Sequence, residues 1–337
     1  MSDFHTYLHI IDANKRALYR STLQAFADSH SKARHSAATP HEPDFIANLA
    51  AYGIPRMAAD WKRILAPFGV ATSVVSVFCH SRPIVHHSLS TTNPEIGDLL
   101  IVHVHHPRKG KSKRTALLLQ AKMMNDLTVE LNTNDHQLLL YQHWPTFQFV
   151  RPSIPGVTLD VKPKQAHRGA QYLLVDDDHF MGPYSCVYSI SEADDTLIPG
   201  QSLSRAIYKV LCFDEGKEFL GRKASTRRLD WSRLIWMLME QSIGKNFKRK
   251  NIGVHSKPRV HGSNLSGMSG LFACLTSNPG TRHHSFLSDV FGAEKWNQIE
   301  LGEGGNHLFE SNEDVGIPTV IIETSYMDSE KIERAGG

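Results

Sequence analysis

The clearest pattern along the chain is a pair of apolar runs, residues 99–102 and 117–119, each with polar residues at its ends. Short apolar runs bounded by turn-forming residues predict buried strands. The segment between them, residues 107–114, is polar and contains Pro and Gly, which predicts a turn. The two runs are therefore predicted to be neighbouring strands of an antiparallel hairpin.

Polar side chains gather at one end of this hairpin. Asp98 opens the first run, while Gln120 and Lys122 close the second. Side chains two residues apart on a strand point to the same face, so Gln120 and Lys122 share a face. Burying a charged side chain costs free energy, so a charged residue next to an apolar run suggests a functional role. The pattern therefore predicts a site built from one carboxylate, one amide and one lysine.

Further apolar patterns predict the elements around the hairpin. The expected elements are helix 11–29, helix 44–65, strand 71–79, strand 84–85, helix 134–144, strand 147–150, strand 171–175, helix 201–213, helix 230–247 and strand 318–323. Asp44 is predicted to cap the second helix, and the stretch Gly53-Ile54-Pro55 is predicted to interrupt it.

Composition places the chain among globular proteins. Of its 337 residues, 41% are hydrophobic and 21% are charged. The net charge of +3 excludes a general polycation, so a nucleic-acid site would have to be a local basic patch. No apolar run approaches about eighteen residues, and the first residues do not begin a signal peptide. A cytoplasmic location without membrane contact is expected.

The predicted site suits metal-dependent hydrolysis of a phosphodiester. Mg²⁺ prefers hard oxygen ligands, which Asp98 offers directly and Gln120 offers through its amide oxygen or a bound water. Lys122 could orient or deprotonate the attacking water, or stabilise the charge that develops on the phosphate. Glu95 would face the opposite way on a regular strand, but a bulge at Gly97 could turn it inward as a further ligand.

The order of Asp98, an apolar strand and Gln120-x-Lys122 resembles the PD-(D/E)XK, or restriction-endonuclease-like, nuclease superfamily. That superfamily usually has Asp or Glu at the position of Gln120, so the chain resembles its Gln-x-Lys variant, found in some bacterial defence nucleases. The resemblance implies an α/β fold with an αβββαβ core and a mixed central sheet. It also implies Mg²⁺ or Mn²⁺ as cofactor, DNA rather than RNA as substrate, and a role in bacterial defence against phage or plasmids.

Three parts of the chain are expected on this basis. Residues 1–43 would form an N-terminal helical segment, and residues 44–180 the nuclease-like core. Residues 181–337 would form an α-rich C-terminal α/β extension, which could recognise substrate, dock a partner subunit or pair with a second copy of the chain.

Several residues near the predicted site are candidates for binding nucleic acid. The hairpin turn carries five cations, namely Arg108, Lys109, Lys111, Lys113 and Arg114. Beside a nuclease site they would make sequence-independent phosphate contacts, although a surface turn can carry such charges without a function. Gln137, one turn into helix 134–144, could position the substrate.

Two alternatives remain open from the sequence. Gln120 removes one negative charge from the metal site, so the chain could be a non-cleaving nuclease-fold subunit that binds nucleic acid or a partner protein. His103 and His105 share a strand face, which is an arrangement typical of zinc ligands, so a zinc hydrolase is the second alternative. Because side chains alternate along a strand, both histidines point to the face away from Asp98, which would place them on the outer face or near bound nucleic acid.

Overall fold

The computed structural model describes residues 3–35, 39–79, 83–150, 156–177, 186–243, 248–249, 269–274, 286–291, 307–311 and 316–327. Its strands are β1 Val70–Phe78, β2 Val85–His87, β3 Leu99–His106, β4 Lys113–Met124, β5 Val129–Glu130, β6 Phe147–Phe149, β7 Thr158–Leu159, β8 Ala170–Asp176, β9 Tyr188–Ser191, β10 Thr196–Leu197, β11 Gln201–Ser202, β12 Lys217–Glu218, β13 Lys248–Arg249, β14 Ser269–Cys274, β15 His307–Ser311 and β16 Thr319–Tyr326. Its α-helices are α1 Asp3–Ala13, α2 Lys15–Arg34, α3 Glu42–Asn48, α4 Ile54–Leu65, α5 His136–His143, α6 Leu203–Leu211, α7 Arg222–Ser225, α8 Trp231–Ile243 and α9 Phe286–Phe291.

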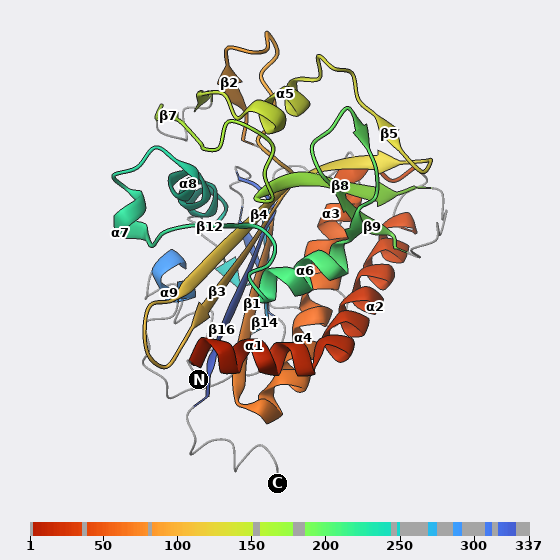
Figure 1. Cartoon of the computed structure of the whole chain (residues 1–337). Coiled ribbons are helices and arrows are strands. Elements are labelled where there is room, and N and C mark those ends of the chain that lie inside the picture. Colours follow the sequence, from red (N-terminus) through yellow and green to blue (C-terminus); the bar gives the residue numbers. More distant parts are fainter. Residues whose placement is uncertain are drawn as a thin grey trace.

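A mixed 11-stranded sheet forms the centre of the molecule (Figure 1). Its strand order is β11-β9-β8-β4-β3-β16-β1-β14-β15-β13, and β12 pairs with part of β4. Both parallel and antiparallel pairs occur, as in β4 with β8 and β3 with β4 respectively. The expected α/β class with a mixed central sheet is therefore confirmed.

Helices cover both faces of this sheet because its central strands are apolar on both sides. Along β3, Leu100 and Val102 belong to one buried cluster, while Leu99 and Ile101 belong to the other. Helices α1 to α4 and α6 pack on the second cluster, and α5, α8 and α9 pack on the first (Figure 1). Among the helices that the structure describes, none combines the length and apolarity needed to span a bilayer.

The predicted hairpin is confirmed. Strands β3 and β4 pair antiparallel, with Leu99 opposite Leu119 and Ile101 opposite Leu117. The pairing continues one residue further, where the Asp98 N–H donates to the Leu119 carbonyl at 2.8 Å. Asp98 therefore stands directly beside the end of β4 that carries Gln120 and Lys122.

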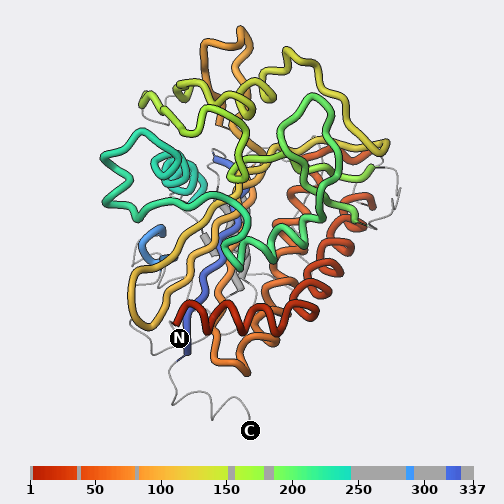
Figure 2. The backbone as a smooth tube through the Cα atoms, in the orientation of Figure 1, coloured from red at the N-terminus to blue at the C-terminus, as the bar shows by residue number. Residues whose placement is uncertain are grey.

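One neighbour of the hairpin comes from the far end of the chain. Strand β16 lies between β1 and β3, parallel to β3 and antiparallel to β1, so that Val320 is in register with Ile101 on one side and Ser76 on the other. Figure 2 shows this late segment running between two early ones. Residues on both sides of position 180 thus build one sheet.

The strand predicted at residues 147–150 exists as β6 but does not belong to the central sheet. It pairs with β2 and β7 in a separate three-stranded sheet. Phe147 and Phe149 are buried while Gln148 is exposed, a pattern that suits a small surface sheet. All residues of β8 are buried, and β8 takes the place parallel to β4.

The N-terminal helices differ from the prediction at their ends. The predicted helix 11–29 is part of a longer region in which α1 ends at Ala13 and α2 begins at Lys15. The predicted helix 44–65 starts earlier, at Glu42, and a π-helical turn, Leu49–Gly53, joins α3 to α4. Asp44 is not the first residue of α3. The Asp44 carboxylate nevertheless accepts the His41 N–H at 2.9 Å and so stabilises the start of the helix.

Candidate functional site

Asp98 and Gln120 are in direct contact at one end of the hairpin. The Gln120 side-chain amide donates to the Asp98 carboxylate, which also accepts the Ala121 N–H at 2.6 Å. Both side chains are buried, with exposures of 1% for Asp98 and 2% for Gln120. A buried carboxylate is strongly destabilising unless it is paired, so these donors explain how the fold tolerates Asp98.

Lys122 lies next to this pair and is held by helix α5. It is two residues beyond Gln120 on the same strand face, and its ammonium donates to the Gln137 side-chain oxygen at 2.8 Å. Gln137 is one turn into α5, whose start is fixed by Asp135 accepting the N–H groups of Gln137 and Leu138. The predicted Gln137 thus contacts Lys122 and sets its direction.

Two buried tyrosines near the site were not identified from the sequence. Tyr141 of α5 donates to the Ile96 carbonyl at 2.9 Å, which ties the segment before Asp98 to the helix. Tyr172 of β8 is in register beside Gln120. Burial raises the pKa of both phenols, and the negative charge of Asp98 adds to the shift. Tyr172 was missed because its position depends on the parallel pairing of β4 and β8, which no local pattern reveals.

The Gln120 side-chain oxygen and the Tyr172 hydroxyl are buried in this site without a hydrogen-bond partner among the described residues. Such atoms are rare in folded proteins because each costs about 1–3 kcal/mol. They lie on neighbouring strands, where the oxygen can accept and the hydroxyl can donate a further hydrogen bond.

The residues fit part of a magnesium shell. Asp98 supplies one carboxylate and Gln120 one amide oxygen, and Mg²⁺ commonly takes one or two protein oxygens and completes its shell with water and substrate phosphate. Within the ranges that the structure describes, no group of three or more His, Cys, Asp or Glu side chains could hold a metal ion. Any cation here would therefore depend on Asp98, on the Gln120 oxygen and on groups from outside the protein.

Glu95 lies in the segment that leads into the hairpin. Its backbone forms an isolated antiparallel bridge with Ile84, and its side chain is half-buried. Gly97 is needed for space, because an added Cβ would lie 2.8 Å from a Leu118 methyl carbon and 3.2 Å from the Tyr141 hydroxyl. Glu95 as a metal ligand remains a prediction.

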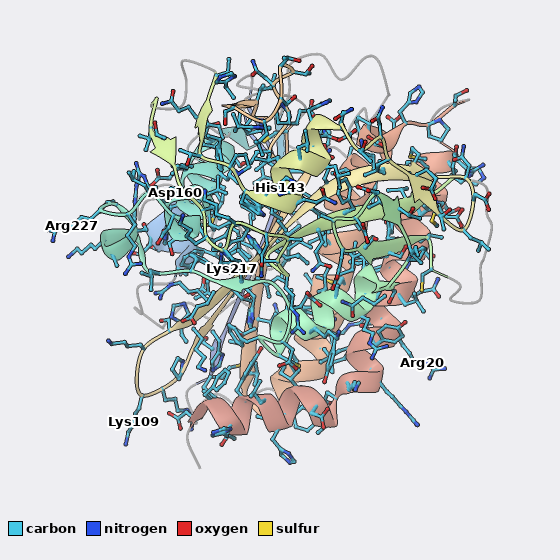
Figure 3. The ribbon with its side chains drawn as sticks, turned by 45° about the horizontal axis from the view of Figure 1, so that its top comes forward. Arg20, Lys109, His143, Asp160, Lys217 and Arg227 are labelled. Carbon is cyan, nitrogen blue, oxygen red and sulfur yellow. The ribbon has the colours of Figure 1, made fainter. Side chains whose placement is uncertain are left out.

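The structure does not bring the predicted basic loop to the site. Residues 107–112 join the other ends of β3 and β4, so at about 3.3 Å per residue they lie roughly 25 Å from Asp98. Figure 3 shows Lys109 at the lower edge of the molecule, away from His143 of α5.

The loop cations make contacts within the protein at their own end of the hairpin. Arg108 lies over the Tyr326 ring at 4.7 Å, and Lys113 over the Phe4 ring at 3.8 Å. The Lys109 N–H donates to Asp3. Arg114 is half-buried, and burial lowers its pKa. Lys111 is exposed in the same turn. These contacts attach the loop to α1 and to the end of β16.

His103 and His105 point away from Asp98, as strand parity predicted, but they are not on an outer face. Both are fully buried beneath α1, where His105 stacks on Tyr7 with ring centroids 3.9 Å apart. His103 has partners for both ring nitrogens, the Val210 carbonyl and the Thr324 hydroxyl, each at 3.0 Å. The prediction of an outer-face position was therefore wrong, because α1 covers this face of the sheet.

Buried histidines make the stability of the fold depend on pH. Burial lowers the pKa of His103 and His105 to about 3, whereas each has its ordinary value of 6.5 in the unfolded chain. Between these values the unfolded chain binds more protons, so the stabilisation is complete above about pH 6.5 and is lost as pH falls towards 3. We expect the free energy of unfolding to fall by on the order of 2 kcal/mol per histidine between pH 7 and pH 5.

Urea unfolding at the two pH values measures this change. The variant His103→Gln should lose part of the pH dependence, because one buried titrating ring is removed. Equal stability at pH 7 and pH 5 in the original protein would contradict buried, neutral histidines.

Comparisons of the chain with family models, with curated proteins and with solved structures found no match. The function has to be argued from the site itself. That site contains a buried carboxylate, an amide with an open oxygen, a lysine held by a helix and an open phenol.

Proposed function

We propose that the protein is a metal-dependent nuclease that hydrolyses phosphodiester bonds in DNA. The observation that carries the proposal is the contact between Asp98 and Gln120 on one sheet face, with Lys122 two residues further on. These three side chains come from the ends of two adjacent strands, as the resemblance to PD-(D/E)XK nucleases requires. Phosphodiester hydrolysis needs a metal site and a nearby cation, and the three side chains offer both.

Each residue has a distinct role in this proposal. Asp98 and Gln120 would hold Mg²⁺ or Mn²⁺, once the Gln120 amide has turned its oxygen towards the ion. The bound ion would polarise the phosphate and lower the pKa of its water. Lys122, positioned by Gln137, would orient the attacking water or stabilise the charge on the phosphate oxygens.

The order of elements supports the same proposal. When the short strands β2, β5, β6 and β7 outside the central sheet are set aside, helix α4 is followed by β1, β3, β4, α5 and β8. This order is compatible with the αβββαβ order that the resemblance implies, with β8 in the place that was predicted for the strand at residues 147–150. Strand β16 is an addition between the first two of these strands. A role in bacterial defence is proposed from the resemblance alone.

A second candidate function is a nuclease-fold subunit that binds nucleic acid or a partner protein without cutting. The observation that favours it is the single carboxylate in contact with Gln120, at a place where an acidic pair would bind Mg²⁺ more strongly. Loss of one ligand charge would weaken metal binding.

Cleavage assays distinguish the two functions. Purified protein is incubated with supercoiled and linear DNA, and with RNA of the same sequence, in Mg²⁺, in Mn²⁺ and in EDTA. The nuclease proposal expects DNA cleavage with either metal and none in EDTA. Tight binding without cleavage under every condition would instead support the non-cleaving subunit.

A further inference from the structure

A strongly basic surface lies on the same face of the sheet as the candidate site. The segments 156–168 and 217–230 together contain eight Lys or Arg residues and three Asp or Glu residues. The whole chain is almost balanced, with 37 basic and 34 acidic residues, so the excess is local. We name this the α7 surface and define it by its exposed cations Lys162, Lys164, Arg168, Arg222, Lys223, Arg227 and Arg228.

The two segments are held together by hydrogen bonds to backbone carbonyls. The Asp160 N–H donates to the Leu229 carbonyl at 2.6 Å, and the Lys217 ammonium donates to the Lys162 carbonyl. The surface is thus built by the fold rather than by one run of sequence. In Figure 3, Arg227 extends away from the ribbon, and Asp160 and Lys217 lie between it and the centre of the molecule.

Only some of these charges are neutralised. Asp160 pairs with Lys162 at 3.3 Å and with Lys164 at 2.5 Å. Arg222 pairs with Glu240 of α8 at 2.9 Å, and Arg228 pairs with Asp230 at 3.2 Å. Lys223 and Arg227 have no ion pair among the residues that the structure describes. Two exposed cations four residues apart, left without carboxylates, favour an anionic partner.

The α7 surface is connected to the candidate site through α5. The Lys164 ammonium donates at 2.6 Å to the carbonyl of Trp144, the residue that caps the C-terminus of α5. The Trp144 and Trp231 rings pack edge to face, with their centroids 5.8 Å apart. This contact joins the end of α5 to the start of α8, the helix that follows α7. Gln137, which holds Lys122, is seven residues earlier, or about 10 Å along the helix.

We propose that the α7 surface binds the phosphate backbone of a DNA duplex next to the bond that is cut. This inference rests on the proposed nuclease function and names the surface that holds its substrate. Each strand of a duplex carries one phosphate for about every 3.4 Å along the helix axis, so a duplex bound at Lys122 also has phosphates about 10 Å further along that axis, which is the distance along α5 to the end where Lys164 binds. These contacts would be made to the phosphates and not to the bases, so binding would be independent of base sequence. The surface takes the place that the Arg108–Arg114 loop was predicted to fill.

The experiment measures duplex binding in EDTA at several salt concentrations, so that cleavage plays no part. In the double variant Lys223→Gln/Arg227→Gln, the slope of log affinity against log salt should fall by about 1.8, or 0.9 for each lost phosphate contact. The charge-conserving variant Lys223→Arg/Arg227→Lys should keep the original slope.

The matched control is Arg16→Gln/Arg20→Gln, which removes two exposed charges from α2 on the opposite face of the sheet and should leave the slope unchanged. An unchanged slope in the Lys223→Gln/Arg227→Gln protein would overturn the inference, even if the original protein cuts DNA. A flattened slope would support it, even if the original protein binds DNA without cutting. Failure of the original protein to bind any duplex, with binding to an acidic protein instead, would also overturn it.

Discussion

Lys122→Ala is expected to lower the rate of DNA cleavage by about 10³-fold while the fold stays intact. Removing a preorganised group that stabilises transition-state charge typically costs about 10²–10³-fold in rate, and Lys122 is the cation that the structure holds beside Asp98 and Gln120. The structural cost is small, because the half-buried lysine loses one hydrogen bond to Gln137, worth about 1 kcal/mol. Plasmid cleavage at saturating Mg²⁺, together with thermal unfolding, measures both effects.

Two further variants make this result specific. Lys122→Met keeps the aliphatic stem and removes only the charge, so it should be as inactive as Lys122→Ala. Lys32→Ala removes an exposed lysine of α2, where it lies over the Tyr52 ring, and should cut at the original rate. Normal cleavage by purified Lys122→Ala protein would show that the mechanism proposed above is wrong.

Asp98→Asn is expected to be about as severe, and much worse than Gln120→Glu. Asn can keep the contact with the Ala121 N–H, and the Gln120 amide can turn to accept from it, so the fold should survive. The carboxylate on which metal binding depends is lost, and a loss of about 10³-fold corresponds to about 4 kcal/mol of transition-state stabilisation. Mg²⁺ titration of the cleavage rate is the measurement.

Gln120→Glu tests the amide as a ligand. It places two carboxylates in contact within a buried site, so without metal one of them must bind a proton or the fold is destabilised. Mg²⁺ should relieve this repulsion and raise the thermal midpoint of the variant more than that of the original protein. Gln120→Leu, of similar volume, should lose activity because the oxygen is gone.

The outcomes of these substitutions separate the possible ligands. If Gln120→Leu stays active while Asp98→Asn is inactive, Gln120 is a packing residue and Glu95 becomes the next ligand to test. Full activity in Asp98→Asn would place the catalytic site elsewhere in the chain. His103 and His105 would not replace it without rearrangement, because both rings are buried under α1.

The hairpin and its three polar residues could be predicted because they depend on short-range rules. Side chains alternate with a period of two along a strand, and a turn of a few residues sets which strand ends meet. Asp98, Gln120 and Lys122 are therefore placed by about twenty-five residues of sequence. The opposite orientation of His103 followed from the same parity.

The elements that surround the hairpin are set by strand pairing and hydrogen bonds between residues far apart in the sequence. Val320 lies beside Ile101, Tyr172 beside Gln120, and the backbone of Asp160 bonds to Leu229. No local periodicity encodes such partners, because an apolar strand presents the same pattern to every other apolar strand. The cover of α1 over the histidines was unpredictable for the same reason.

The basic residues illustrate the difference most directly. Five cations close to Asp98 in sequence lie roughly 25 Å away, since a hairpin carries its turn to the far end of its strands. The cations of the α7 surface are distant in sequence but lie on the face that holds Lys122. The local order of residues determined which side chains form the candidate site, and the packing of helices on the sheet decided which charges stand beside it.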